Sequence, residues 1–365
     1  MHTVNYLKHW KKQLRSPEEA LKKLEKSLHI RVGTYSDRVI LNYNPLKSPK
    51  FNDITQECRG LILSYFAFDV LSRSFDRFFN HRETFESLEF PIERSIIYEK
   101  IDGSLMNLYF ANNEWAVASR KMAFAEGTCA TGQSFYELFL ASIGKDDLFS
   151  VDLDRDYTYI FEMVSPETRV VKSYGAEPQA FFLCARHKLS GAYLMPGSIK
   201  TPFGLKTPKE FRLSSLEEIQ NSLVNLPPLD EGYVVYDPVT SQRLKIKNPI
   251  YVAMSHKRFN GALSAKSILT MMSNGEIDEY LNYFPEDTRL VEVYQKALKA
   301  FVKDVKENWI KYKDIKEQKE FAQKINMLKV KSLLFSMRSR GYTLEEVIKS
   351  LELTSLLNFL NHYKI

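Results

Sequence analysis

The spacing of apolar residues changes near Tyr251, and this change limits what the 365-residue chain can fold into. From Arg31 to this point, short runs of β-branched, aromatic and aliphatic residues alternate with turn-forming segments, as strands do. Beyond it, apolar residues recur at helical spacing. The pattern predicts an α+β domain with mixed or antiparallel sheets at residues 1–252, including a small N-terminal part of helix and strand. An all-α domain follows at residues 253–365.

Local signals place the expected elements. The β-prone runs lie at residues 39–43, 61–65, 96–100, 105–110, 115–119, 157–164, 180–185, 233–236 and 244–246. Asn112-Asn113 separates two of these runs as a tight hairpin would. Capping signals predict helices that begin at Ser16, Ser134, Ser214 or Ser215, and Thr343. Strands and helices do not alternate regularly, which argues against a doubly wound parallel sheet.

The expected helical domain has a basic stretch. Its apolar face is formed by Leu298, Phe301, Val302, Val305, Trp309 and Tyr312. Residues 299–331 carry ten lysines and five acidic residues. Such a stretch could line an RNA groove, or it could be a solvated helix face with ion pairs one turn apart.

Composition allows several classes of protein. The formal net charge is +6 and 13% of the residues are aromatic, which suits a polyanion-binding protein that stacks bases but also a plain basic enzyme. Cys58, Cys129 and Cys184 are odd in number and far apart, so neither a disulfide framework nor a zinc knuckle is indicated. No segment resembles a signal peptide or a membrane span, and a cytoplasmic location is expected, in a microbe or a phage-infected cell.

The segment Tyr98-Glu99-Lys100-Ile101-Asp102-Gly103-Ser104 sets a lysine amine beside a carboxylate. Lys100 should lie where a strand ends, and Gly103 should allow a close backbone approach or a positive φ. Partial burial among other cations would lower the pKa of Lys100 and favour a nucleophilic free amine. The alternative is a hairpin turn with a solvated Lys100 and Asp102.

Four further segments place charges on or beside expected strands. Arg59 precedes one run and could form a bidentate contact with phosphate. Glu162 lies inside an apolar run, where a ribose hydroxyl or a metal would explain a carboxylate that is otherwise costly to bury. Glu231 begins another strand, and Lys245 and Lys247 share a strand face that needs an anion. Each of these residues, taken singly, also has a simpler explanation. Arg59 could be a surface arginine, Glu162 could face water on an edge strand, and Lys245 and Lys247 could be solvated lysines of an edge strand.

Together these segments resemble the covalent nucleotidyltransferases, which are the ATP-dependent DNA and RNA ligases and the mRNA capping enzymes. The pattern is most similar to the RNA ligase 1 family, the bacteriophage ligases that reseal cleaved tRNA anticodon loops. The resemblance spans residues from about 30 to 280 and rests on Glu-Cys-Arg-Gly at 57–60, Phe-Phe-Asn at 78–80, Lys-x-Asp-Gly-Ser-Leu at 100–105, Phe-Glu-x-Val-x-Pro at 161–166, Glu-Gly-Tyr-Val at 231–234 and Lys-Ile-Lys at 245–247.

The resemblance implies a nucleotidyltransferase domain in which Lys100 attacks the α-phosphate of ATP. AMP then passes to an RNA 5′-phosphate, and a 3′-hydroxyl displaces it to seal the strand. Glu231 would act beside Lys100, holding the lysine or a metal. The remaining implied site residues would bind the nucleotide: Tyr43, Arg59, Arg77, Asp102, Gly103, Arg120, Glu162, Lys245, Lys247 and Tyr251. Arg77 and Arg120 stand where the family usually has lysine, and Asp278 matches a metal-binding aspartate only weakly.

The implied cofactors are ATP and Mg²⁺, with Mn²⁺ as a substitute. The implied partner is single-stranded or broken-loop RNA such as tRNA, acted on by a monomer whose substrate ends are prepared by a separate kinase and phosphatase. DNA ligases and capping enzymes share the catalytic core but continue into an OB-fold, whereas the tail expected here is helical. A catalytically silent RNA-binding relative is a further alternative, which the intact set of charged residues opposes.

Overall fold

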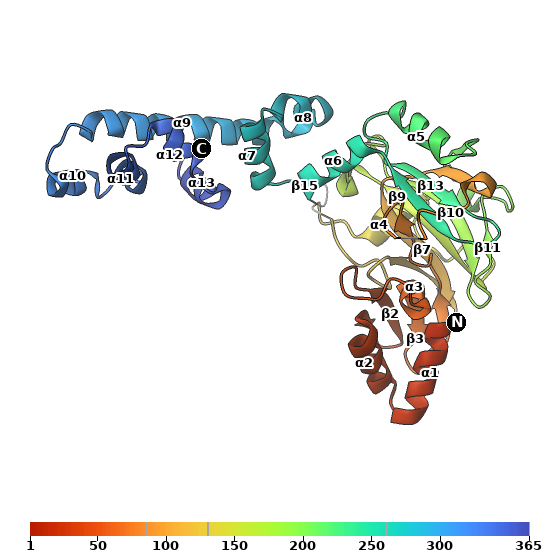
Figure 1. Cartoon of the computed structure of the whole chain (residues 1–365). Helices are drawn as coiled ribbons and strands as arrows, with labels where there is room; N and C mark the ends of the chain where they lie inside the picture. The colour runs from red at the N-terminus through yellow and green to blue at the C-terminus, as the bar shows by residue number, and fades with distance from the viewer. Residues whose placement is uncertain (85, 130, 260–261, 365) are drawn as a thin grey trace. The chain divides into compact units, whose positions relative to one another are not determined.

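The computed structural model describes residues 1–84, 86–129, 131–259 and 262–364. The chain forms two compact units, Met1–Ala253 and Met254–Ile365, which are shown in Figure 1. All three cysteines are free, with Cys58 and Cys184 buried. Among the described residues, none of the helices is both long and apolar enough to cross a bilayer.

The first unit begins with two helices that pack on a small sheet (Figure 1). These elements are α1 (His2–Leu14), α2 (Pro17–Leu28), β1 (Ile30–Thr34), β2 (Arg38–Tyr43), α3 (Asp53–Glu57), β3 (Arg59–Ser64) and β4 (Val70–Ser72), with strand order β1-β2-β3-β4. The predicted start of α2 is confirmed, since the Ser16 side chain accepts a hydrogen bond from the Glu19 amide. Helix α1 was not predicted, because no side chain caps its N-terminus and lysines and histidines crowd its apolar positions.

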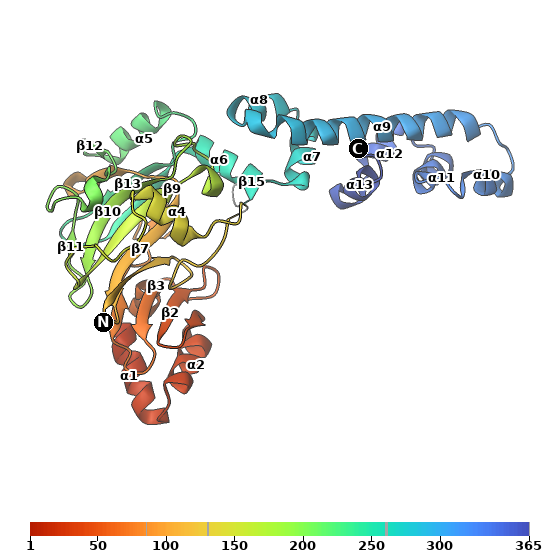
Figure 2. The same cartoon turned by 180° about the vertical axis from the view of Figure 1, so that it is seen from behind.

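Two five-stranded sheets form the rest of this unit, as seen from behind in Figure 2. The first has the order β11-β10-β9-β7-β8, with β7 (Ser104–Ala111), β8 (Glu114–Ser119), β9 (Tyr157–Val164), β10 (Gln179–His187) and β11 (Tyr193–Leu194). The second has the order β12-β6-β13-β14-β5, with β5 (Phe79–Asn80), β6 (Ile96–Glu99), β12 (Glu210–Phe211), β13 (Gly232–Tyr236) and β14 (Arg243–Lys247). Among the described strand pairings of these two sheets, only β14–β5 is parallel, so the predicted mixed and antiparallel architecture is confirmed.

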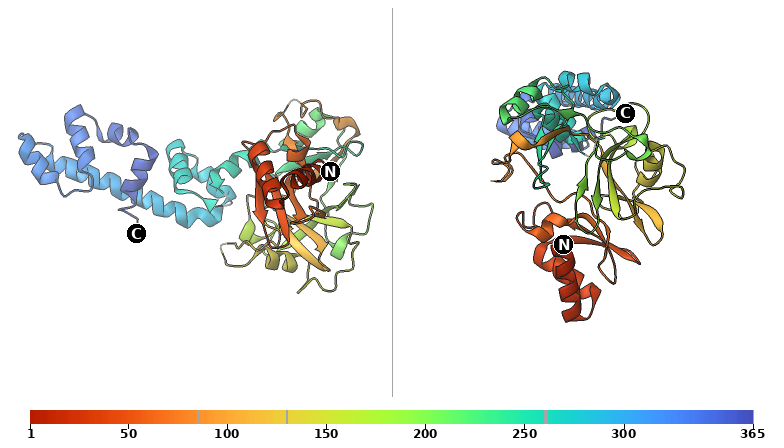
Figure 3. Two further views of the ribbon diagram at one scale, coloured as in Figure 1. Left: turned by 90° about the horizontal axis from the view of Figure 1, so that it is seen from below. Right: turned by 90° about the vertical axis from the view of Figure 1, so that its right-hand side faces the viewer.

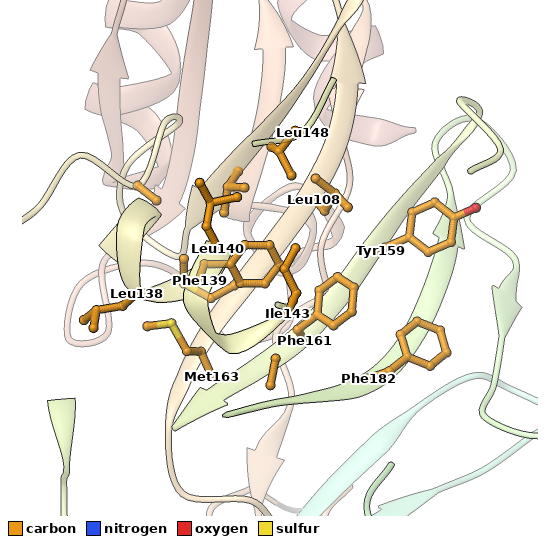
Figure 4. Close-up of a cluster of buried hydrophobic side chains, with 14 of the residues drawn as sticks. Leu108, Leu138, Phe139, Leu140, Ile143, Leu148, Tyr159, Phe161, Met163 and Phe182 are labelled. Carbon is orange, nitrogen blue, oxygen red and sulfur yellow. The ribbon is translucent and has the colours of Figure 1, made fainter. Parts of the chain in front are cut away.

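Helices cover one face of each sheet. Helix α4 (Phe135–Ser142) packs on β7, β9 and β10, and Figure 4 shows Phe139 lying against Phe161, with ring centroids 5.4 Å apart. Helix α5 (Leu216–Val224) covers the second sheet, where Ile219 packs with Ile97 and Val235. The β7–β8 turn is the predicted hairpin, and Asn112 and Asn113 both have positive φ. These two cores hold the strands that carry the charged residues.

The second unit is helical, as predicted (Figure 3). Helix α6 (Pro249–Lys257) leads into it, and its other helices are α7 (Ala265–Asn274), α8 (Ile277–Tyr283), α9 (Thr288–Tyr312), α10 (Gln318–Ile325), α11 (Lys331–Arg340), α12 (Leu344–Lys349) and α13 (Leu353–Leu360). Short 3-10 turns occur at Ile92–Arg94, Pro166–Thr168, Pro202–Gly204 and Pro285–Asp287. The expectation of no strand after Tyr251 is wrong in one detail, because β15 (Arg258–Phe259) pairs with β16 (Ala262–Leu263).

The long helix α9 presents the expected apolar face in part. Phe301 and Val305 are buried, whereas Leu298, Val302, Trp309 and Tyr312 are only half-buried, and the buried face continues instead through Val291, Tyr294 and Ala297. On the solvated side, Lys303 lies 3.7 Å from Glu307 one turn away. The basic stretch therefore includes the ion pairing that a solvated helix face would show.

Candidate active site

Lys100 lies at the predicted strand end. Strand β6 stops at Glu99, and the Lys100 amide still donates to the carbonyl of Gly232 on β13 over 2.9 Å. The turn that follows requires glycine, since a Cβ added to Gly103 would lie 2.3 Å from the Met163 carbonyl oxygen on β9. Of the two predicted reasons for Gly103, close backbone approach is the one found. The turn thus fixes the backbone of Lys100 against both large sheets.

Glu231 bridges two lysines. Its Oε2 accepts a hydrogen bond from Lys100 Nζ over 2.7 Å, and its Oε1 lies 2.8 Å from Lys247 Nζ. The Lys100 side chain is 19% exposed and the Glu231 side chain 5% exposed, so the alternative of a solvated turn is wrong. Because β13 pairs with both β6 and β14, one carboxylate at its start can reach both ammonium groups.

This pairing reverses the expected pKa shift of Lys100. Burial lowers the pKa of Lys100, but the carboxylates of Glu231 and Glu162 outweigh burial, and the net pKa is raised. Conversely, burial raises the pKa of Glu231, and the charges of Lys100 and Lys247 bring the net pKa below its usual range. Lys100 is therefore an ammonium group paired with Glu231 in the structure, and the predicted lowering of its pKa to give a free amine is wrong.

A second set of charges lacks such close partners. Burial, with Arg59 and the neighbouring lysines adding to it, lowers the pKa of Lys245 to about 7. Burial likewise raises the pKa of Glu162 to about 7 despite the Lys100 charge. Burial and Arg120 lower the pKa of Arg59 to about 10, and Arg59 Nη1 has no hydrogen-bond partner among the described residues. Buried cations with unused donors are suited to an incoming anion.

The strand positions of these residues exclude the edge-strand alternatives. Glu162 lies on β9, between β10 and β7, and Lys245 lies on β14, between β13 and β5. Lys245 Nζ is 4.8 Å from the centre of the Phe78 ring. Both charged side chains therefore lie on inner strands, so exposure at a sheet edge does not account for a charged residue at either position.

A cavity of about 250 Å³, here called the lysine pocket, lies beside this group. Its lining residues are Arg59, Phe75, Phe78, Tyr98, Glu99, Lys100, Ile101, Gly103, Leu105, Arg120, Glu162, Leu183, Met195, Pro196, Pro208, Val234 and Arg243. Aromatic and aliphatic walls with a few convergent charges are typical of small-ligand sites. This mixture suits a flat ring that carries phosphate groups.

Tyr43 connects two of the predicted arginines. The guanidinium carbons of Arg77 and Arg120 lie 4.2 Å and 5.2 Å from the centre of its ring. A planar guanidinium stacks on a ring in a way that a lysine ammonium does not, which gives a physical reason for arginine at both positions. Arg120 lines the lysine pocket, whereas Arg77 is buried behind Tyr43 and also contacts the Phe79 ring.

Hydrogen bonds of Asp102, one of them from Tyr251, anchor the turn that follows Lys100. Asp102 Oδ2 accepts from the amides of Val171 and Lys172 over 2.9 Å and 3.0 Å, and Oδ1 accepts from the Tyr251 hydroxyl over 2.7 Å. Asp102 is buried, and protein donors use both of its oxygens. The geometry gives these two residues a positioning role, and direct contact with a nucleotide stays a prediction.

The predicted metal ligand belongs to the second unit. Asp278 is exposed in the first turn of α8, in the second unit. Across the residues that the structure describes, no three or more His, Cys, Asp or Glu side chains gather as a metal site would. The metal-binding role of Asp278 stays a prediction.

Sequence reasoning missed Arg243. It lines the lysine pocket, and its guanidinium carbon lies 4.1 Å to 4.5 Å from the ring centres of Tyr193, Phe75 and Tyr236. A signal was present, because the two-residue period of β14 puts Arg243 on the same face as Lys245 and Lys247.

Comparisons with known proteins identify relatives of this chain. Residues 57–251 match the model of a family described as RNA ligase. A protein of Autographa californica nuclear polyhedrosis virus, whose name describes a bifunctional polynucleotide kinase/RNA ligase, is 30% identical over 92% of this chain but only 50% of its own length. The RNA ligase of Rhodothermus phage RM378 is 24% identical over 77% of each chain. This chain thus spans half the length of the viral relative.

Solved structures of other proteins are similar over part of the fold, and an archaeal protein is one example. An archaeal ATP-dependent RNA ligase superposes with a TM-score of 0.43 and 14% identity, covering 69% of this chain and 67% of the archaeal one.

Proposed function

Because the chain belongs to the RNA ligase family, we propose that it is an ATP-dependent RNA ligase that joins an RNA 5′-phosphate to a 3′-hydroxyl. One observation carries the proposal. Lys100 is fixed by Glu231 at the wall of a pocket that also presents Arg59 and Arg120. A lysine nucleophile beside buried anion-binding cations is what transfer of a nucleotidyl group needs.

The reaction divides into three transfers. Lys100 Nζ loses a proton and forms a bond to the α-phosphorus of ATP, while the bond from that phosphorus to pyrophosphate breaks. An oxygen of the RNA 5′-phosphate then takes the AMP group from Lys100, which regains its amine. Finally the 3′-hydroxyl attacks the RNA 5′-phosphorus, its proton leaves, and AMP departs. Covalent catalysis of this kind replaces one difficult condensation with easier steps.

The residues in and beside the lysine pocket have distinct proposed roles. Arg59, Arg120 and Lys245 contact phosphate oxygens, which would satisfy the free Arg59 donor and restore the charge of Lys245. Glu162 accepts from the ribose hydroxyls. Glu231 holds the Lys100 nitrogen in place and, through Lys247, brings a second cation to the phosphates.

A divalent cation, Mg²⁺ or Mn²⁺, would offset the charge of the triphosphate. Magnesium is commonly held by one or two carboxylates together with substrate phosphates, so a dedicated cluster of protein ligands is not needed. Lysines engage both Glu231 oxygens. We propose Asp278 as a protein ligand of the cation, as the family resemblance implies. The chain's own residues then position the reacting groups.

The proposed substrate is single-stranded or broken-loop RNA, such as a cleaved tRNA, sealed by a monomer in the cytoplasm. The viral relative supports a link to end preparation, because its name includes a polynucleotide kinase and this chain spans half of its length. We propose that a separate kinase and phosphatase prepare the RNA ends.

Incubation with α-labelled ATP and Mg²⁺, followed by a denaturing gel, tests the proposal. We expect a labelled adduct with the unaltered chain and none with Lys100→Arg. Lys121→Arg, the same change at an exposed lysine, serves as the control. An unlabelled chain would refute the ligase, and label from GTP instead would favour a capping enzyme.

A second assay compares substrates. Circularisation of a 5′-phosphorylated single-stranded RNA is expected to exceed sealing of nicked duplex DNA. The opposite preference would favour a DNA ligase, and labelling without any sealing would favour an RNA-binding relative that retains only the first step.

A further inference from the structure

A second cavity lies in the same unit and has no role in the proposed chemistry. Its volume is about 530 Å³, twice that of the lysine pocket. We call it the arginine pocket; its lining includes Phe51, Gln56, Arg73, Asp76, Arg77, Phe78, Phe79, Thr84, Ser87, Arg186, Tyr193, Gln242 and Arg243. Four of these residues are arginines, which outnumber the acidic residues of the lining.

The arginine pocket adjoins the lysine pocket. Phe78 and Arg243 line both cavities, so together they form a shared wall. Lys245 approaches the Phe78 ring of this wall within 4.8 Å. A chain-like ligand with one end at Lys100 would therefore have its next unit near the arginine pocket.

Arg73 is an arginine of this pocket with few hydrogen-bond partners among the described residues. Arg186 is paired with Asp76, whose Oδ1 accepts from Arg186 Nη1 over 2.9 Å. Arg73 makes one long contact, from Nη1 to the Leu189 carbonyl over 3.4 Å, and its buried Nε has no partner among the described residues. Burial and the nearby Arg186 charge also lower the pKa of Arg73. An anion bound at the Arg73 guanidinium would meet a cation that has no carboxylate partner among its described hydrogen bonds.

Aromatic rings provide the second part of the site. Phe51 is 59% exposed, and its ring centre lies 6.1 Å from that of Phe79. An exposed ring beside a cation-lined cavity is the usual platform for stacking a base of single-stranded nucleic acid. The hydroxyl and amide groups of Thr84, Ser87 and Gln242 add donors and acceptors for a ribose or a base edge.

We propose that the arginine pocket binds one nucleotide of the RNA strand, adjacent to the end being joined, with its phosphate at Arg73 and its base on Phe51. The inference rests on the proposed function, because it takes RNA as the ligand. It adds a specificity site that recognises the polynucleotide rather than ATP.

Binding of a fluorescent 5′-phosphorylated oligoribonucleotide to the full chain, measured by anisotropy at several salt concentrations, tests this site. Phe51→Ala should weaken binding by about fivefold to a hundredfold with an unchanged salt slope. Arg73→Ala should reduce the slope of log K against log salt by about 0.7, as expected for one lost phosphate contact. Matched controls are Phe149→Ala, at a ring that is 95% exposed outside the pocket, and Arg31→Ala, at an exposed arginine of β1.

The outcomes separate the two proposals. If the unaltered chain labels Lys100 from ATP but Phe51→Ala and Arg73→Ala bind RNA like their controls, the arginine pocket is overturned while the ligase stands. If labelling fails in the unaltered chain, the ligase is refuted, and the RNA-binding comparison still decides the pocket. Because Phe51 is exposed, its replacement is expected to leave folding intact, so the test does not depend on Arg73 alone.

Discussion

Replacing Gly103 by alanine would test whether the turn after β6 sets the position of Lys100. The new Cβ would lie 2.3 Å from the Met163 carbonyl oxygen and 2.9 Å from a Val164 methyl carbon, whereas ordinary contacts begin at 3.4 Å. The turn and β9 must therefore separate by about 1 Å, a displacement that can slow a positioned reaction about a hundredfold. The forced contact should also lower the free energy of unfolding by about 1–3 kcal/mol.

The rate of Lys100 labelling from α-labelled ATP in a single turnover is the assay, with urea denaturation as the measure of stability. Gly127→Ala is the matched control, because its added Cβ would meet the sulfur of the flexible Met122 side chain at 3.1 Å. We expect the control to label at nearly the rate of the unaltered chain. Equal labelling rates and equal urea midpoints for the two variants would refute the idea that the turn positions Lys100.

Three other predictions concern groups around this turn. Tyr251→Phe leaves Asp102 Oδ1 without its 2.7 Å donor and should reduce the free energy of unfolding by about 1–3 kcal/mol; an unchanged urea midpoint would contradict this. Burial and Arg59 lower the pKa of Lys245 to about 7, so this amine is mostly neutral at pH 8 and mostly charged at pH 6. ATP binding should therefore be accompanied by proton uptake at pH 8 and by little proton uptake at pH 6. Calorimetry in buffers of different ionisation enthalpy measures this uptake, which Lys245→Met should abolish. Glu231→Gln removes the carboxylate that raises the pKa of Lys100, so burial should dominate and the pH profile of labelling should move to lower pH; an unmoved profile would rule out the assigned pairing.

Local patterns predicted the parts of the fold that depend on neighbours in sequence. The two-residue period located β6, β7, β9, β13 and β14, and capping residues located α2, α4 and α12. Helix α1 was not predicted, because its sequence pattern is weak in isolation and its apolar residues are buried by packing on the adjacent sheet. Propensity alone does not include such tertiary packing.

The sequence predicted most residues of the candidate site, but it did not predict which of them contact one another. Tyr43, Arg77 and Arg120 come from β2, the segment before β5 and the turn after β8, and nothing local indicates that the two guanidinium groups share one ring. Likewise, Asp102 was expected to face a nucleotide, but amides of a loop about seventy residues away occupy one of its oxygens. Contacts between distant segments determine which side chains remain available.

The charge state of Lys100 shows the same dependence most clearly. Sequence reasoning assumed that neighbouring cations would dominate, but Glu231 lies 2.7 Å from the amine and Glu162 adds to its effect. These carboxylates outweigh burial and raise the pKa of Lys100, which disfavours the free amine. In the proposed reaction, the carboxylate that holds Lys100 therefore also disfavours its reactive free amine. If Lys100 is the nucleophile, as proposed, ATP binding is expected to weaken the Lys100–Glu231 pair before attack. A motif in the sequence suggests which lysine reacts, whereas its charge state depends on the contacts that β13 and β14 bring to it.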